Sequence, residues 1–195
     1  HYENHKEEAA RAKFFEQSQQ RYLEKAKGLD AKLSENKTIA ALFQLYRSTN
    51  GEYWTNSKKW MVSDDLNKWH GIKCNEEGDV ISISLPKNKM TGLLPDDIFE
   101  PLQALEYLDL EGNNLHGELP SSLRGLQNLK EIHLDNNKKL CGPVMEFSEN
   151  VNFTFNNTSL GTVGDIVMEY STFPFWVISC EKFLQLEDIT SHEVA

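Results

Sequence analysis

The 195-residue chain lacks the short motifs that mark common nucleotide-binding and catalytic sites. It contains no G-x-x-x-x-G-K-[ST], G-x-G-x-x-G, H-E-x-x-H, G-x-S-x-G or C-x-x-C sequence. No long apolar run is present either, so the sequence predicts no transmembrane helix. We therefore expect a non-enzymatic protein that needs no cofactor and holds no metal.

Basic residues are scarce in the larger part of the chain. The net charge is −10, and residues 39–195 carry 12 Lys and Arg against 23 Asp and Glu, whereas residues 1–38 carry 8 against 7. An acidic surface repels the phosphates of nucleic acids and of anionic membranes, so neither is an expected partner. We interpret the excess acid first as a well-hydrated soluble surface, with an acidic docking site as the alternative.

An internal repeat fills the middle of the chain. Residues 80–95 align with residues 105–120 at a shift of 25, and a third copy starts at Leu129, which aligns with Leu105 at a shift of 24. The shared frame is L-x-x-L-x-L-x-x-N, and this frame with a period in the low to mid twenties indicates leucine-rich repeats. The expected fold is an α/β solenoid in which each coil adds one short strand to a parallel sheet.

Each coil has fixed positions with separate physical roles. A single coil cannot bury its own apolar face, so the apolar positions are expected to point into one continuous core. These positions are Val80, Ile83, Leu85, Met90, Leu105, Leu108, Leu110, Leu115, Leu129, Ile132 and Leu134. An asparagine follows each strand, at Asn88, Asn113 and Asn137, where an inward side chain can satisfy backbone groups of its own and adjacent coils.

The segment Leu115-His116-Gly117-Glu118-Leu119-Pro120 has the form L-x-G-x-L-P, and with it the chain resembles plant-type leucine-rich-repeat proteins. Residues 45–51, followed by Trp54, Trp60 and Trp69, resemble the N-terminal cap of such proteins. They include receptor-kinase ectodomains and secreted algal and protist proteins. The resemblance implies a short right-handed solenoid of about three to four coils with a helical N-terminal cap.

Four segments are expected along the chain. Residues 1–37 would form a leading helix and linker, residues 38–79 the N-terminal cap, residues 80–143 the repeats, and residues 144–195 a degraded repeat, a C-terminal cap and a polar tail. Gly51 is expected to end the cap helix.

The leading segment carries a narrow apolar stripe. Phe15, Tyr22 and Leu29 recur at seven-residue spacing among good helix formers. This stripe either packs along the chain's own solenoid or binds a partner protein, and the sequence favours neither.

Three cysteines make an odd set. Plant-type caps hold a local disulfide in a C-x-W-x-G-[VI]-x-C stretch, but Asn67 stands at the first cysteine position here, so that bridge to Cys74 cannot form. The resemblance implies instead a bridge between Cys141 and Cys180 in the closing cap. A reducing compartment with no bridges is the alternative.

N-x-S/T sequons begin at Asn36, Asn152 and Asn156, and they predict N-glycosylation if the chain is secreted. The chain starts at His1 rather than Met, as it would after removal of a signal peptide or another targeting segment. With the resemblance, this favours the secretory pathway, extracellular or at the cell surface. An organelle lumen, such as the thylakoid lumen, is the alternative.

The repeat register predicts a polar face on the sheet. Residues one period apart lie side by side on neighbouring strands, about 4.8 Å apart. The outward positions then form three columns, which are Ser82, Tyr107 and Glu131; Ser84, Asp109 and His133; and Pro86, Glu111 and Asp135. The candidate partner-binding residues on this concave face are Tyr107, Asp109, Glu111, Glu131, His133 and Asp135.

The column of Ser84, Asp109 and His133 has the composition of a catalytic triad, but its order places the acid between nucleophile and base. A cation held by the acidic side chains is another alternative. We favour a solvated or partner-facing acidic strip over both.

The sequence thus predicts a non-enzymatic protein-binding module. The first interpretation is a structural or scaffold subunit of a larger assembly, held by the leading helix and the repeat surface. The alternative is a secreted or cell-surface recognition protein that binds a peptide or glycan.

Overall fold

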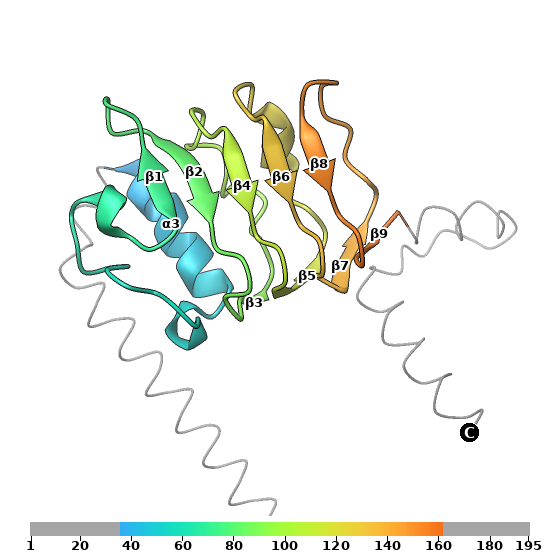
Figure 1. The fold of residues 1–195 in the computed structure, drawn as a ribbon, viewed down its shortest axis with the longest axis horizontal. Helices are drawn as coiled ribbons and strands as arrows, with labels where there is room; N and C mark the ends of the chain where they lie inside the picture. The colour runs from blue at the N-terminus through green and yellow to red at the C-terminus, as the bar shows by residue number, and fades with distance from the viewer. Residues whose placement is uncertain (1–35, 162–195) are drawn as a thin grey trace, which may run out of the picture.

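The computed structural model describes residues 36–161; residues 1–35 and 162–195 lie outside the described part. The described chain is a solenoid whose strands stack in two sheets, with an α-helix behind the first strands (Figure 1). Its elements are α3 (Lys37–Ser48), η1 (Gly51–Tyr53), η2 (Leu66–Lys68), β1 (Ile72–Cys74), β2 (Val80–Ser84), β3 (Thr91–Gly92), β4 (Tyr107–Asp109), β5 (Asn114–Gly117), η3 (Ser121–Gly125), β6 (Glu131–His133), β7 (Lys139–Gly142), β8 (Asn152–Thr154) and β9 (Ser159–Leu160). Among residues 36–161, no helix is long and apolar enough to cross a membrane.

The main sheet has the strand order β1-β2-β4-β6-β8. Strands β2, β4, β6 and β8 pair in parallel, one strand from each coil. The short leucine-rich-repeat solenoid with a parallel sheet, predicted from the repeat frame, is therefore confirmed. Strand β1 pairs antiparallel with β2 and closes the N-terminal edge of the sheet, which the repeat frame does not predict.

A second sheet, with the order β3-β5-β7-β9, runs along the solenoid after the turn that follows each main strand. Its strands are two to four residues long. Such short strands show no apolar alternation, so the sequence pattern does not predict this sheet. Two sheets joined by tight turns hold each coil on both sides of its core.

The buried apolar side chains of the cap and of the coils form one continuous core. Leu85, Leu110 and Leu134, which occupy the same position in three successive coils, are each 0% exposed. Burying such a side chain stabilises the fold by roughly 1.5–3 kcal/mol. The leucine frame therefore builds one continuous apolar ladder through the domain.

Buried asparagines tie neighbouring coils together behind the main sheet. The Asn113 side-chain oxygen accepts from the backbone N–H groups of Asn88 (2.9 Å) and Met90 (3.0 Å), in the preceding coil. Its amide nitrogen donates to the carbonyl oxygens of Leu85 (2.9 Å) and Leu110 (2.8 Å). One side chain thus pairs four buried backbone groups, of which only the Leu110 carbonyl oxygen has a second donor, Asn137.

Asn137 and Asn88 act in the same way in the coils on either side. Asn137 donates to the carbonyl oxygens of Leu110 and Leu134, each at 2.9 Å, and accepts from the N–H of Leu115 at 3.1 Å. Asn88 accepts from the N–H of Asn56 at 2.8 Å, which joins the first coil to the cap. The ladder therefore runs from the cap to the third coil.

The N-terminal cap is built on aromatic side chains. Trp54, Trp60 and Trp69 are each at most 6% exposed, and their rings pack in series with centroids 4.8 Å and 5.0 Å apart. Each indole N–H donates to a backbone carbonyl oxygen, so the buried polar atoms are paired. The tryptophans cover the apolar end of the first coil together with Tyr46 of α3.

The end of α3 differs from the expectation at one residue. Asn50, rather than Gly51, takes the left-handed conformation that follows the helix, with φ of 56°. Gly51 is required for another reason, because a Cβ atom there would overlap the ring of Tyr46. Glycine at this position therefore makes room for the aromatic packing of the cap.

Asn67 stands where a cap cysteine was expected from the resemblance. Its side-chain oxygen accepts from the backbone N–H of Cys74 at 2.8 Å, so a hydrogen bond joins the two positions that a disulfide would join. Cys74 is a free, partly buried thiol, and burial, followed by the charges of Asp65 and Asp79, raises its pKa. The thiol therefore stays protonated at neutral pH.

Asn67→Cys is expected to form a disulfide with Cys74 and to stabilise the cap. In the chain-entropy account a loop this short contributes about 2–3 kcal/mol, and the lost hydrogen bond costs about 1 kcal/mol. Intact mass would show the loss of two hydrogens, and denaturant unfolding with and without reductant would give the gain. Asn67→Ser, unfolded with and without reductant in the same way, controls for any effect of the reductant at other sites in the chain. A bridged variant whose stability matches that of Asn67→Ser would contradict the expectation.

Candidate ligand-binding face

The strand register brings the predicted columns together and extends each of them to β8. Ser82 lies beside Tyr107, and Tyr107 beside Glu131. In the next column Ser84 lies beside Asp109, and Asp109 beside His133. Strand β8 adds Asn152 to the first column and Thr154 to the second. Because alternate residues of a strand share one face, all of these side chains lie on the same side of the sheet.

A third column lies where the strands end. The backbone N–H of Gly112 donates to the carbonyl oxygen of Asp135 at 2.8 Å, and the N–H of Asn136 donates to that of Asn156, also at 2.8 Å. This ladder continues the register, so Glu111, Asp135 and Asn156 follow one another across the sheet. We call Tyr107, Asp109, Glu111, Glu131, His133 and Asp135 the acidic face.

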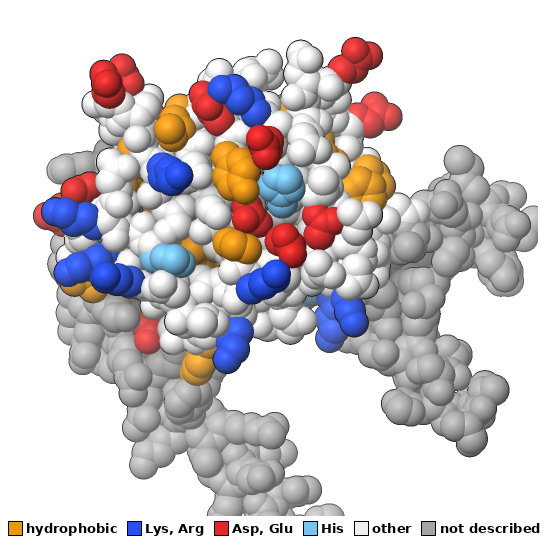
Figure 2. Space-filling view, in the orientation of Figure 1, with side chains coloured by type: hydrophobic (Ala, Val, Ile, Leu, Met, Phe, Trp, Pro, Cys, Tyr) orange, Lys and Arg blue, Asp and Glu red, His pale blue; other side chains and the backbone are white. Residues whose placement is uncertain are grey.

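An aromatic pair occupies the middle of the acidic face. The rings of Tyr107 and His133 have centroids 5.6 Å apart and are tilted by 55°. Figure 2 shows acidic side chains gathered around a hydrophobic side chain and a histidine over β4 and β6. Burial, followed by the negative charges of Asp109 and Glu131, raises the pKa of Tyr107. Its hydroxyl therefore stays protonated at neutral pH.

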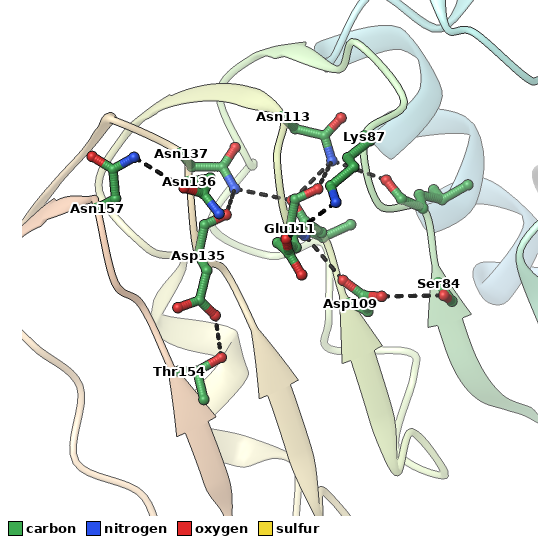
Figure 3. A network of polar contacts seen from close by, with 12 residues as sticks. Ser84, Lys87, Asp109, Glu111, Asn113, Asp135, Asn136, Asn137, Thr154 and Asn157 are labelled. Carbon is green, nitrogen blue, oxygen red and sulfur yellow. Dashed lines mark hydrogen bonds and ion pairs between the residues drawn. The ribbon is translucent and has the colours of Figure 1, made fainter.

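The carboxylates of the face are held in place by short-range contacts (Figure 3). Asp109 accepts from the Ser84 hydroxyl at 3.4 Å and from the backbone N–H of Glu111 at 3.0 Å. Lys87 lies 3.7 Å from Glu111 at the border of the face, in an exposed ion pair. Such a pair contributes little, because water screens it and both side chains lose freedom.

Asp135 is the most tightly held of these carboxylates. It accepts from the Thr154 hydroxyl, and its other oxygen accepts from the backbone N–H and side-chain amide of Asn156 at 2.8 Å and 2.6 Å. Burial alone would raise its pKa, but these hydrogen bonds outweigh burial and hold the pKa of Asp135 below its ordinary value. Asp135 is therefore ionised at neutral pH.

The side-chain contacts do not form a catalytic triad from Ser84, Asp109 and His133. The ring nitrogens of His133 contact Thr154 (Nδ1, 3.0 Å) and Glu131 (Nε2, 3.1 Å). A triad needs the base to contact the nucleophile, whereas Ser84 donates to the acid. Within residues 36–161, no three side chains of His, Cys, Asp or Glu are grouped so that they could hold a metal ion.

Comparison with known proteins finds the same repeat. Residues 80–138 match the family described as Leucine rich repeat. Receptor-like protein kinase 7 of Arabidopsis thaliana is 38% identical over 78 residues, which are 40% of this chain and 8% of that protein. The probable leucine-rich repeat receptor-like protein kinase At5g49770 of the same plant is 40% identical over 72 residues, 36% of this chain and 8% of that protein.

A solved structure supports the same fold. The crystal structure of PEPR1-AtPEP1 matches with a TM-score of 0.50 at 21% identity, covering 62% of this chain and 18% of that one. The chain contains a leucine-rich-repeat domain related to plant receptor-kinase ectodomains. The matched residues of this domain are repeats, a non-catalytic module, and the chain spans less than a tenth of the two curated relatives.

The sequons of the leucine-rich-repeat domain lie at two separate places. Asn36 precedes α3, and its side-chain oxygen accepts from the N–H of Ile39 at 3.1 Å as an N-cap. Asn152 and Asn156 are exposed and lie in the first and third columns of the face, on the β8 side. A glycan on either of these two would border the acidic face.

Some predicted residues fall outside the described part of the domain. Phe15, Tyr22 and Leu29 of the leading segment do so, as does Cys180. Cys141 lies in β7 and is 0% exposed. The bridge between Cys141 and Cys180 and the role of the leading stripe stay predictions.

Sequence reasoning missed Asn152, Thr154 and Asn156 as members of the face. The register pairs Glu131 with Asn152, so the shift from the third coil to the fourth is 21 rather than 24 or 25. The sequence signal that could have found this strand is the alternation of polar and apolar residues over 152–156. Phe153 and Phe155 are its two inward-facing residues. Phenylalanine in place of the frame leucines hides this strand from a leucine pattern.

Proposed function

We propose that the acidic face of this leucine-rich-repeat domain binds a peptide ligand, as part of a recognition protein of the secretory pathway or cell surface. The curated relatives, which are receptor-like kinases by name, support a recognition role. The related domains of plant receptors support an extracellular location. The described architecture offers a sheet whose backbone groups are already paired, so its side chains are left to contact a partner.

The observation that carries this proposal is the position of Tyr107. It lies at the centre of the sheet, packed on His133 and flanked by the carboxylates of Asp109 and Glu131. Tyrosine is enriched at the energetic centres of interfaces, because it offers a large apolar area and a polar tip with few rotatable bonds. A side chain already held by its neighbours also loses little entropy on binding.

The charge of the face selects the ligand. Three carboxylates, those of Asp109, Glu131 and Glu111, act on Tyr107. Lys87 pairs with Glu111 at the border of the face. Opposite charge steers a partner to a surface and fixes its orientation. We therefore expect a peptide that places a Lys or Arg side chain beside Tyr107.

The other role expected from the sequence, a scaffold subunit, depends on the leading segment. That segment lies outside the described residues, so the structure offers no observation in its favour. The similarity to receptor-like kinases supports recognition over a scaffold role.

Tyr107→Ala is expected to weaken peptide binding by about 2 kcal/mol, or about thirtyfold in Kd. A displayed library of random peptides would be selected on the full chain, and the Kd of the recovered peptides measured by calorimetry. We expect these peptides to be enriched in Lys and Arg.

Tyr53→Ala is the matched control, because Tyr53 is 46% exposed and is not part of either sheet. It should leave Kd unchanged. Recovered peptides that bind Tyr107→Ala as tightly as the wild type, or that lack basic residues, would overturn the proposed site.

A further inference from the structure

Four side chains of the acidic face and its β8 border form a continuous hydrogen-bonded chain across β6 and β8. Glu131 contacts Nε2 of His133 at 3.1 Å, and Nδ1 of the same ring contacts the Thr154 hydroxyl at 3.0 Å. The Thr154 hydroxyl in turn contacts a carboxylate oxygen of Asp135. The chain therefore has three contacts, each of which needs one proton.

The protons available to these three contacts can be counted by starting from the Asp135 carboxylate, which only accepts. Asp135 is ionised, since its hydrogen bonds hold its pKa low, so it can only accept. The single proton of the Thr154 hydroxyl is therefore directed to Asp135. Thr154 can then only accept from Nδ1 of His133, and the Glu131 carboxylate can only accept from Nε2.

Both ring nitrogens of His133 must therefore donate, which describes the imidazolium and not the neutral ring. A neutral ring carries one N–H. It would present a lone pair either to the Glu131 carboxylate or to the Thr154 oxygen, and one contact would be lost. Glu131 is the partner free to leave, because its side chain is 48% exposed.

We propose that Glu131, His133, Thr154 and Asp135 form a proton-binding site that couples pH to ligand recognition on the acidic face. The charged and titratable groups around His133 are Tyr107 and Asp109 on β4, with Glu131 and Asp135 from the β6 segment; its neighbour on β8, Thr154, is neutral. When His133 loses its proton, the face becomes one charge more negative and Glu131 is released for a cationic ligand.

The sign of the effect on stability follows from the same count. The second proton on the His133 ring makes a hydrogen bond in the folded state that the unfolded chain lacks. This hydrogen bond therefore stabilises the fold at low pH. It is lost when His133 gives up its proton as pH rises. Binding of a cationic ligand changes in the opposite direction and strengthens as pH rises.

The stability test needs no ligand. Between pH 5.5 and pH 8, the folding equilibrium constant of the wild type is expected to fall about threefold to tenfold more than that of Glu131→Gln. This is the worth of one ordinary hydrogen bond, because water screens the exposed Glu131 carboxylate. Glutamine keeps the shape of the side chain, but its amide donates to the neutral ring and removes the demand for a second proton. His70→Gln, at an exposed histidine, controls for the loss of any titrating ring.

Nitrogen NMR of His133 gives a second measurement, in which both ring nitrogens should carry protons at pH 5.5 and one at pH 8. Equal pH dependence of stability in the wild type and Glu131→Gln would overturn the site. So would a His133 ring that stays neutral at pH 5.5.

The coupling to ligand rests on the proposed function and is measured separately. The Kd of a lysine-containing peptide from the library selection should fall between pH 5.5 and pH 8 in the wild type and change less in Glu131→Gln. A pH-independent Kd, together with the expected stability data, would overturn the coupling alone. If no peptide binds at any pH, the proposed function and the coupling fail, while the proton-binding site is still decided by stability and NMR.

Discussion

Asn113→Ala is expected to lower the free energy of unfolding by several kcal/mol, more than most single substitutions do. The substitution leaves two backbone N–H groups and the Leu85 carbonyl oxygen without a partner in the middle of the solenoid, while the Leu110 carbonyl oxygen keeps its hydrogen bond from Asn137. Each unpaired buried group costs about 1–3 kcal/mol, and water entering the space left by the side chain recovers part of this. Denaturant unfolding followed by circular dichroism would measure the loss.

Asn114→Ala is the matched control, because Asn114 is the next residue and is exposed on β5. It should change stability by less than about 0.5 kcal/mol. If the two variants were equally stable, the buried asparagines would not be what joins the coils.

Gly92→Ala is expected to destabilise the domain by about 3 kcal/mol or more. Gly92 has φ of 141°, a conformation that side chains rarely adopt, and a Cβ atom there would overlap the carbonyl oxygen of Ser48 at the end of α3. The overlap is with backbone, so it can be relieved only by moving the helix away from β3. Loss of stability would be read from thermal and denaturant unfolding.

Gly78→Ala separates the cost of the positive φ from the cost of the steric overlap. Gly78 also has positive φ, at 90°, but a Cβ atom there would meet nothing within 4 Å. It should cost only the left-handed strain of about 1–2 kcal/mol. A Gly92→Ala variant no less stable than Gly78→Ala would show that α3 moves freely against the second sheet.

The repeat frame predicts the main sheet because its signal is redundant. Leu85, Leu110 and Leu134 each mark the same inward position, and the asparagine that follows marks the turn. The shifts of 25 and 24 residues between successive coils then assign every outward residue of β2, β4 and β6 to its column. The composition of the acidic face therefore followed from the sequence.

The contacts within that face could not be predicted in the same way. They depend on β8, whose shorter shift from β6 is not shared by the other coils. Without Thr154 in register, His133 has no partner for Nδ1, and the proton count cannot be made. The second sheet was likewise hidden, because its short strands are set by the tight turns of the coil and not by an apolar pattern.

The placement of the indoles has a consequence for how this domain can be observed. Trp54, Trp60 and Trp69 pack within one cap, at the opposite end of the solenoid from β8. In a Trp176→Phe variant, which removes the fourth tryptophan of the chain, their emission reports mainly on the neighbourhood of the first coil, whereas backbone dichroism averages over every coil. Because each coil contacts chiefly its neighbours, the two signals diverge if the array melts progressively and coincide if it melts as a unit.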